Sequence, residues 1–255
     1  MTDLVVTARG PVRLVELNRP EQLNAMSEEL HAGLASVWED VAADPEARVV
    51  VLTGRGRAFS AGGNFGIMTR VQQDAAFRER NVDEARRIIT GMVRCPLPVI
   101  AAVNGPAVGL GCSLALLSDL VLIADDAYIA DPHVQVGLVA GDGGALVLPL
   151  LVGLTRAKEL LFLGDRVSAE EAVRLGIANR VVPKDKILTE AMDLAQRLAT
   201  LPVKALRETK RAVNLHLEQA IAAVLEPALL AEQDSMTDPE HIAAVEKIIA
   251  ARGAR

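Results

Sequence analysis

The sequence predicts an α/β fold in which buried parallel strands alternate with helices. Three short apolar runs, at residues 49–52, 99–103 and 120–123, are rich in β-branched residues and lack polar alternation, which is typical of strands covered on both faces. Between them lie a long polar stretch, residues 69–87, and a glycine-rich stretch, residues 105–111. This alternation favours repeated units of strands and helices.

The chain is expected to begin with a half-buried strand and an amphipathic helix. Residues 12–17 alternate apolar and charged side chains, the pattern of a strand with one wet face. Ser27 is a candidate N-cap. The helix after it places apolar residues at helical spacing, namely Leu30, Leu34, Val37, Trp38 and Val41.

The pattern of the second half of the chain predicts helices. Residues 168–171 form a capping box, and Pro202 begins a long amphipathic run that is expected to end before Pro227. No linker, composition break or internal repeat divides the chain. We therefore expect a core that carries the functional site at residues 1–195 and a helical region at residues 196–255 that serves assembly and covers this site.

Composition excludes several classes of protein. The net charge of −6 argues against a phosphate-backbone binder, so no nucleic-acid partner is expected. The N-terminus lacks the basic and then apolar layout of a signal peptide, and the longest apolar stretch, residues 145–154, falls short of the ~20 residues of a membrane span. Cys95 and Cys112 are too few for a disulfide framework. These features predict a cytoplasmic protein without a membrane span.

Two glycine-rich turns carry the first chemical signal. Residues 58–64, Ala-Phe-Ser-Ala-Gly-Gly-Asn, follow one buried strand, and residues 104–113, Asn-Gly-Pro-Ala-Val-Gly-Leu-Gly-Cys-Ser, follow another and open a helix. Unpaired amides at such turns can stabilise an oxygen that gains negative charge. Glycines at these junctions also serve tight packing, so either turn alone is a weak signal.

Together with their flanking residues, these turns resemble the enoyl-coenzyme A hydratase/isomerase, or crotonase, superfamily. The matching stretches are residues 17–26, 59–64, 101–105, 109–119 and 164–182. The resemblance implies the crotonase fold, also called ClpP/crotonase-like, of repeated ββα units with a helical C-terminal trimerisation region. It further implies a homotrimer or homohexamer that binds acyl-coenzyme A thioesters and stabilises an enolate with two backbone amides.

The amide positions of the family correspond to Gly63 and Leu110. Leu110 stands where the family often has glycine, but the donor is a backbone N–H, so its side chain can point away. Hydratases of the family use two glutamates to place and activate water. Those positions hold Ser113 and His133 here, which departs from the family's pattern for hydration.

His133 and Asp142 are the candidates for the missing acid and base. An imidazole exchanges protons near neutral pH, and Asp131 or Asp142 can orient it. Asp142 lies before an apolar helix, where it can be an N-cap, a general base, or both. Ser113 can hold a water or simply fill a gap near the helix start.

The remaining site residues concern the bound thioester. Asn24, Ala25, Met26, Ala61 and Gly62 match the family stretches around coenzyme A, and Arg19 is a candidate contact for its phosphates. Coenzyme A would be part of the substrate. The segment 65–77 offers an apolar lining for the acyl group through Phe65, Ile67, Met68 and Val71, or those side chains belong to a packing helix.

The expected function is that of an enoyl-coenzyme A hydratase-like lyase with unusual acid and base residues. The alternatives are isomerisation, decarboxylation or carbon–carbon hydrolysis on the same fold, or a binding subunit without catalysis. No metal is expected, because the four histidines, His31, His133, His216 and His241, are scattered in the sequence and lack ligand spacing. No other cofactor is expected.

Overall fold

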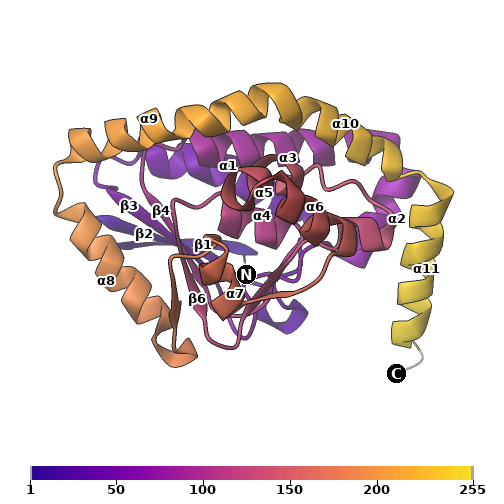
Figure 1. Ribbon diagram of the computed structural model, residues 1–255, viewed down its shortest axis with the longest axis horizontal. Helices are drawn as coiled ribbons and strands as arrows, with labels where there is room; N and C mark the ends of the chain where they lie inside the picture. Colours follow the sequence, from indigo (N-terminus) through magenta and orange to yellow (C-terminus); the bar gives the residue numbers. More distant parts are fainter. Residues whose placement is uncertain (1, 254–255) are drawn as a thin grey trace.

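The computed structural model describes residues 2–253 and contains a six-stranded main sheet (Figure 1). Its strand order is β1-β2-β3-β4-β6-β9, and every neighbouring pair is parallel except β1 with β2. The bounds are β1 Leu4–Arg9, β2 Val12–Leu17, β3 Val49–Gly54, β4 Val99–Val103, β6 Leu120–Ala124 and β9 Arg180–Val182. The strands predicted at residues 12–17, 49–52, 99–103 and 120–123 are confirmed. The expectation of a half-buried strand at residues 12–17 is wrong, because Val15 and Leu17 join one core and Val12 and Leu14 join the other, so β2 is buried on both faces.

Both faces of the parallel part of this sheet are buried, as its unbroken apolar runs require. In β3, Val50 and Leu52 face the core that includes α1 (Glu28–Ala43) and α3 (Ala75–Arg94). Val49 and Val51 face the opposite core, which is closed by α8 (Ile187–Ala199). The alternation follows from the two-residue period of a strand.

A small second sheet positions the site. It contains β5 (Ala107–Val108), β7 (Tyr128–Ala130) and β8 (Val167–Ser168), in that order, with β5 and β7 parallel. Because β5 and β7 are parallel, the segments that leave their carboxyl ends lie side by side. These segments begin at Gly109 and Asp131.

The first half of the chain supplies the predicted helices. Ser27 caps α1 by accepting a hydrogen bond from Leu30 N at 3.0 Å, as predicted. The polar stretch at residues 69–87 lies in α2 (Phe65–Gln73) and α3, so it is largely the solvated side of two helices and not an irregular loop. The helices that follow are α4 Leu110–Leu116, α5 Gly144–Val152, α6 Leu154–Leu163 and α7 Ala169–Arg174, with short 3-10 turns η1 Pro20–Gln22, η2 His133–Val136 and η3 Lys184–Lys186.

The C-terminal helices wrap around this body. In Figure 1, α9 (Val203–Ala220) and α10 (Glu226–Ser235) run across the molecule, and α11 (Pro239–Gly253) descends beside α2. The expected end before Pro227 is wrong, because residues 221–225 form a π-helical turn and α10 begins at Glu226. Pro227 is tolerated in the first turn of α10, where its missing N–H costs little.

Ion pairs fasten the C-terminal helices to the core. Arg86 of α3 pairs with Glu226 at 2.9 Å, and Arg94 pairs with Glu218 at 2.8 Å. Lys210 pairs with Asp119 at 2.6 Å. Within residues 2–253, no helix is long and apolar enough to cross a membrane. The two cysteines are buried and free.

Candidate active site

The two glycine-rich turns meet at the carboxyl ends of adjacent parallel segments. Ser60 forms a parallel bridge with Ala107, and Val108 N donates to Ser60 O at 2.9 Å. Gly62 has a φ of +79°, and a Cβ on it would lie 2.6 Å from Val108 O. The close approach of the turns therefore depends on a glycine at this position.

Gly63 and Leu110 border the same space. A small inner cavity is lined by both residues, and Gly63 also borders a larger outer cavity. Among the residues that the structure describes, neither Gly63 N nor Leu110 N donates to a protein acceptor. Two unpaired amides beside one cavity are the geometry that an oxyanion hole requires.

His133 lies between two carboxylates. Its Nδ1 forms a short hydrogen bond with Asp131 Oδ1, and its Nε2 lies 3.5 Å from Asp142 Oδ2. Asp131 and His133 follow β7, so they stand beside Gly109, which follows β5 and donates from N to Ala130 O at 3.0 Å. The strand pairing thus brings the imidazole next to the turn that contains Leu110.

Asp142 reaches this cluster from the loop before α5. Ser113 Oγ lies 3.4 Å from Asp142 Oδ1, a long and weak hydrogen bond. The N-cap of α5 is Gly143, which has no side-chain cap, so Asp142 does not cap this helix. The geometry thus excludes the N-cap interpretation of Asp142. Its carboxylate faces His133 and Ser113, as the general-base interpretation requires.

The charges of this cluster favour the imidazolium form. Burial acts to lower the pKa of His133, but the negative charges of Asp142 and Asp131 outweigh it and raise the pKa well above 6.5. Burial acts to raise the pKa of Asp131, but the adjacent His133 outweighs it and the pKa is lowered from its usual value. Asp131 and His133 therefore form a charged pair near neutral pH.

Glu232 of α10 is a site residue that the sequence analysis missed. Its side chain is buried, and burial followed by repulsion from Asp142 raises its pKa well above the usual value for glutamate. The sequence contained a usable signal: Glu232 lies on the buried stripe formed by Leu225, Leu229 and Met236. A charged residue on an apolar stripe marks a functional candidate.

The histidines are less scattered in space than their sequence positions suggested. His31, His133 and His241 all line the inner cavity. His31 Nδ1 pairs with Glu84 at 2.7 Å, and His241 Nδ1 lies 2.6 Å from Val136 O. Three of the four histidines, although far apart in the sequence, therefore lie around one cavity, because α1, η2 and α11 converge on it.

The donor set also has the chemistry to hold a cation. His133, Asp142 and Glu232 each offer one ligating atom, and these atoms lie within 4.8 Å of one another. One nitrogen and two carboxylate oxygens suit a divalent metal, and Asp131 would orient the imidazole. The same atoms suit proton transfer, so the cluster itself allows either use.

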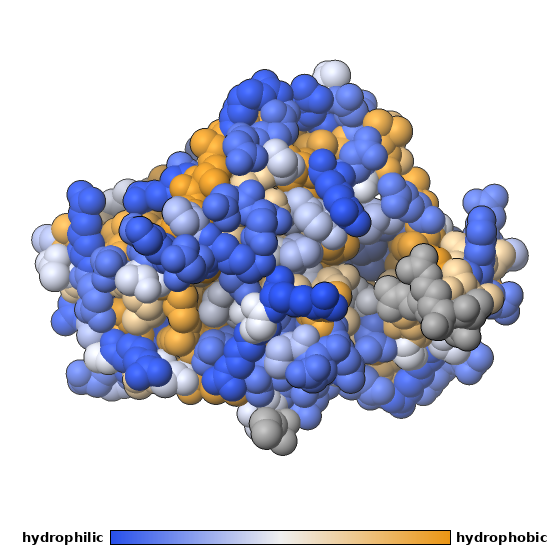
Figure 2. All heavy atoms as spheres, turned by 90° about the horizontal axis from the view of Figure 1, so that it is seen from below, coloured by the Kyte–Doolittle hydropathy of each residue, from blue (hydrophilic) through white to orange (hydrophobic). Residues whose placement is uncertain are grey.

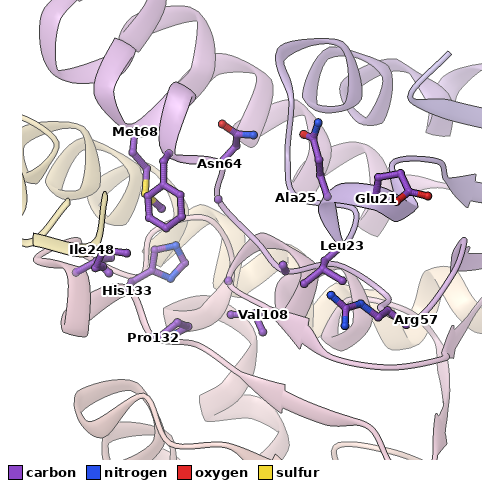
Figure 3. Close-up of a pocket in the computed structure, with 16 residues that line it drawn as sticks. Glu21, Leu23, Ala25, Arg57, Asn64, Met68, Val108, Pro132, His133 and Ile248 are labelled. Atoms are coloured by element: carbon purple, nitrogen blue, oxygen red, sulfur yellow. The ribbon is translucent and has the colours of Figure 1, made fainter. Parts of the chain in front are cut away.

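The outer cavity has a volume of about 520 Å³ and the inner cavity about 90 Å³. Figure 3 shows Met68 of α2 and Ile248 of α11 beside the imidazole of His133, whereas Glu21 of η1 lies at the other end of the outer cavity with Leu23 and Arg57. All four apolar residues expected for the acyl group line one or both cavities, namely Phe65, Ile67, Met68 and Val71. They also belong to α2, so the two interpretations of this segment are compatible.

Only some of the residues that match the coenzyme A stretches of the family line a cavity. Ala25 and Ala61 line the outer cavity, and Met26 lines the inner one. Asn24 is fully buried and its amide donates to Arg55 O at 2.9 Å, so it braces the loop. Gly62 permits the contact between the two turns.

Arg19 is engaged within its own loop. Its guanidinium pairs with Asp3 at 3.1 Å, donates to Ala25 O at 2.5 Å and contacts Gln22. Arg19 is not among the residues that line the outer cavity, whereas Arg57 is. Sequence reasoning missed Arg57, which follows β3 in a turn with no motif of its own.

Comparisons with known proteins identify the family and the fold. The family model of enoyl-CoA hydratase/isomerase matches residues 7–248. A crystal structure of an enoyl-CoA hydratase/isomerase from Mycobacterium paratuberculosis is 50% identical, with a TM-score of 0.95 over 97% of this chain and 98% of that one. A monofunctional enoyl CoA isomerase from M. smegmatis is 34% identical, with a TM-score of 0.72 over 86% and 95% of the two chains.

A curated relative from Mycobacterium tuberculosis, "Probable enoyl-CoA hydratase EchA12", is 36% identical over 235 residues, which are 90% of this chain and 81% of the relative. The family model, this relative and the shared fold point to the same group of proteins. The chain belongs to the enoyl-CoA hydratase/isomerase family of the crotonase superfamily.

Proposed function

We propose that this enzyme adds water to 2-enoyl-coenzyme A thioesters, with the enolate oxygen held by the amides of Gly63 and Leu110. The observation that carries the proposal is the pairing of His133 with Asp142 beside the two glycine-rich turns. The pair supplies one acid and one base, the functions that two glutamates perform in the hydratases of the family.

In the proposed reaction, Asp142 takes a proton from water and the resulting hydroxide bonds to carbon 3. The electrons of the double bond move through carbon 2 to the thioester oxygen, which the two amides stabilise. The His133 imidazolium then gives its proton to carbon 2. Transfer of the proton from Asp142 to His133, whose atoms lie 3.5 Å apart, restores both groups.

Three features support these roles. The raised pKa of His133 keeps it protonated near neutral pH, so it can act as the acid. Asp131 fixes the ring through Nδ1, which leaves Nε2 facing Asp142. Ser113 lies against the other oxygen of Asp142 and limits its rotation.

Double-bond isomerisation is the second candidate. It is favoured by the similarity to the M. smegmatis protein, whose structure is described as a monofunctional enoyl CoA isomerase. An isomerase moves one proton between carbons 2 and 4, which a single acid/base such as His133 can perform. The enolate and its two amide donors are the same in both reactions.

The outer cavity is the proposed site of the coenzyme A portion. Its volume of about 520 Å³ can hold part of an elongated ligand, and Arg57 offers a cation for a phosphate. The inner cavity of about 90 Å³ would take a short acyl group. In this proposal, coenzyme A is part of the substrate.

Incubation of the purified protein with crotonyl-coenzyme A tests the proposal. Hydration removes the enoyl absorbance and adds the mass of one water, whereas isomerisation leaves the mass unchanged. Asp142→Asn and His133→Gln should each lower kcat by about 10²–10⁴-fold. Ser113→Ala is the matched control and should lose far less.

The melting temperature reports whether each variant is folded, and butyryl-coenzyme A binding reports whether it still binds a thioester. Full turnover by Asp142→Asn would exclude Asp142 as the base. Binding of crotonyl-coenzyme A without any change of mass or absorbance would exclude hydration and would leave isomerisation of a 3-enoyl thioester as the remaining candidate.

A further inference from the structure

The inner cavity contains two buried polar atoms that have no partner. They are Oε2 of Glu232 and Nε2 of His241, and both residues line this cavity. Glu232 is 6% exposed and His241 is 1% exposed. Other unpaired side-chain atoms, such as Trp38 Nε1 and Arg207 Nε, belong to residues outside the inner cavity.

Unpaired buried polar atoms are rare because they have lost water without gaining a partner. Two such atoms beside a cavity of about 90 Å³ indicate that its occupant supplies the missing hydrogen bonds. An entirely aliphatic acyl group would leave both unpaired.

The two atoms have complementary hydrogen-bonding character. Nδ1 of His241 lies 2.6 Å from Val136 O and must carry a proton to donate to it, so Nε2 of the neutral ring is an acceptor. A carboxyl accepts through either oxygen and in its protonated form donates through one of them, so the unpaired Oε2 of Glu232 can serve as the donor. The cavity therefore presents one donor and one acceptor to its occupant.

Glu232 is held in place by close packing. A Cβ on Gly141 would lie 2.7 Å from Glu232 Oε2 and 2.5 Å from Ala228 O. The loop of residues 139–144 thus leaves only enough space for this carboxyl. A side chain positioned this tightly can distinguish ligands by their polar groups.

We infer that the acyl group in the inner cavity carries an oxygen function, a hydroxyl or oxo group, beyond the thioester carbonyl, which Glu232 and His241 bind. The inference rests on the proposed acyl-coenzyme A function and narrows its substrate class. A hydroxyl can accept from Glu232 and donate to His241, whereas an oxo group accepts from Glu232.

Isothermal titration of the purified protein with three matched thioesters tests the inference. The probes are butyryl-, acetoacetyl- and 4-hydroxybutyryl-coenzyme A, and the measured quantity is the ratio of each Kd to that of butyryl-coenzyme A. At least one oxygenated thioester should bind about tenfold or more tightly than butyryl-coenzyme A, because buried polar groups penalise a ligand that leaves them unpaired.

Three variants assign this preference to residues. Glu232→Leu should bring the preference down to about onefold, and His241→Phe should reduce the 4-hydroxybutyryl preference most. Glu232→Gln keeps an N–H donor and should retain much of the preference, which guards against a general loss of folding in the leucine variant. Equal affinities of the native protein for all three thioesters would overturn the inference.

A divalent cation is the competing occupant of the same atoms. Titration with ZnCl₂ tests it, and tight zinc binding that Glu232→Gln abolishes would overturn the inference in favour of a metal site. If butyryl-coenzyme A binds and crotonyl-coenzyme A is hydrated, but the oxygenated thioesters bind no more tightly than butyryl-coenzyme A, only this inference fails. If no thioester binds, the proposed function fails with it.

Discussion

Nε2 of His133 lies 3.5 Å from Oδ2 of Asp142, while Nδ1 of the same ring is hydrogen-bonded to Asp131. One imidazole is thereby held between two carboxylates that come from different loops. Asp131 fixes the orientation of the ring, and Asp142 meets its reactive edge. This division of roles gives the two aspartates different expected effects on catalysis.

The pH dependence of activity should report the state of His133. As the acid, His133 must be protonated, so kcat/KM should fall as pH rises through its folded pKa, which lies well above 6.5. Asp131→Asn removes one of the two charges that raise this pKa, so the alkaline limb should move to lower pH. Profiles of kcat/KM for crotonyl-coenzyme A with both proteins measure the shift. Coincident alkaline limbs would show that another group titrates.

Much of the fold is readable in the sequence because its signals are local. The runs at residues 49–52 and 99–103 become β3 and β4, since strands buried on both faces need continuous apolar residues. Ser27 caps α1 as its spacing predicts. The end expected at Pro227 failed because a π-helical turn places this proline in the first turn of α10.

The site could be predicted only in part. His133 stands at the position of a family glutamate and Asp142 follows it in the next loop, so the resemblance directed attention to this part of the chain. Glu232 and His241 come from helices about 100 residues later in the sequence. Their convergence on the cavity depends on tertiary packing, which no local pattern encodes. The place of Glu232 on an apolar stripe was the one available sign.

Gly144 controls the position of Asp131. A Cβ on Gly144 would collide with Asp131 Oδ2, so Gly144→Ala should displace the carboxylate and release the His133 ring. We expect a loss of about 1–3 kcal/mol in the free energy of unfolding, as in other overpacked sites, and a large loss of kcat. Denaturant unfolding of Gly144→Ala, Asp131→Ala and the double variant measures the coupling. Strictly additive losses would contradict this contact.

Arg57 and Arg19 should behave differently. Arg57 lines the outer cavity, so Arg57→Glu should raise the Kd of coenzyme A about tenfold, and salt should weaken this effect. Arg19 is bound to Asp3 and Ala25, so Arg19→Ala should lower the melting temperature more than it changes the Kd. Isothermal titration and thermal unfolding compare the pair. A larger Kd change for Arg19→Ala would reverse the assignment.

The expected homotrimer or homohexamer needs an apolar contact surface. Large apolar side chains are exposed on α6, including Leu154 at 66%, Phe162 at 64% and Leu163 at 53%. Figure 2 shows several separate hydrophobic patches on one face of the molecule. If α6 belongs to the assembly contact, Phe162→Asp should reduce the mass measured by light scattering to that of a smaller species. An unchanged trimer would place the contact elsewhere.

The stability of the protein should depend on pH through the buried carboxyl of Glu232. Its folded pKa lies above the unfolded value, so the folded state binds the proton more tightly. The contribution of this group is therefore fully present below the unfolded pKa and is lost as pH rises toward the folded pKa. Glu232→Gln cannot ionise and escapes this loss. The measured quantity is the melting temperature of Glu232→Gln minus that of the native protein. This difference should be at least about 2 °C larger at pH 8 than at pH 5, which corresponds to about 1 kcal/mol in a chain of this size. The control is Glu226→Gln, which changes an exposed ion-paired glutamate on the same helix. An equal gain in melting temperature for both variants would mean that burial of Glu232 is not the cause.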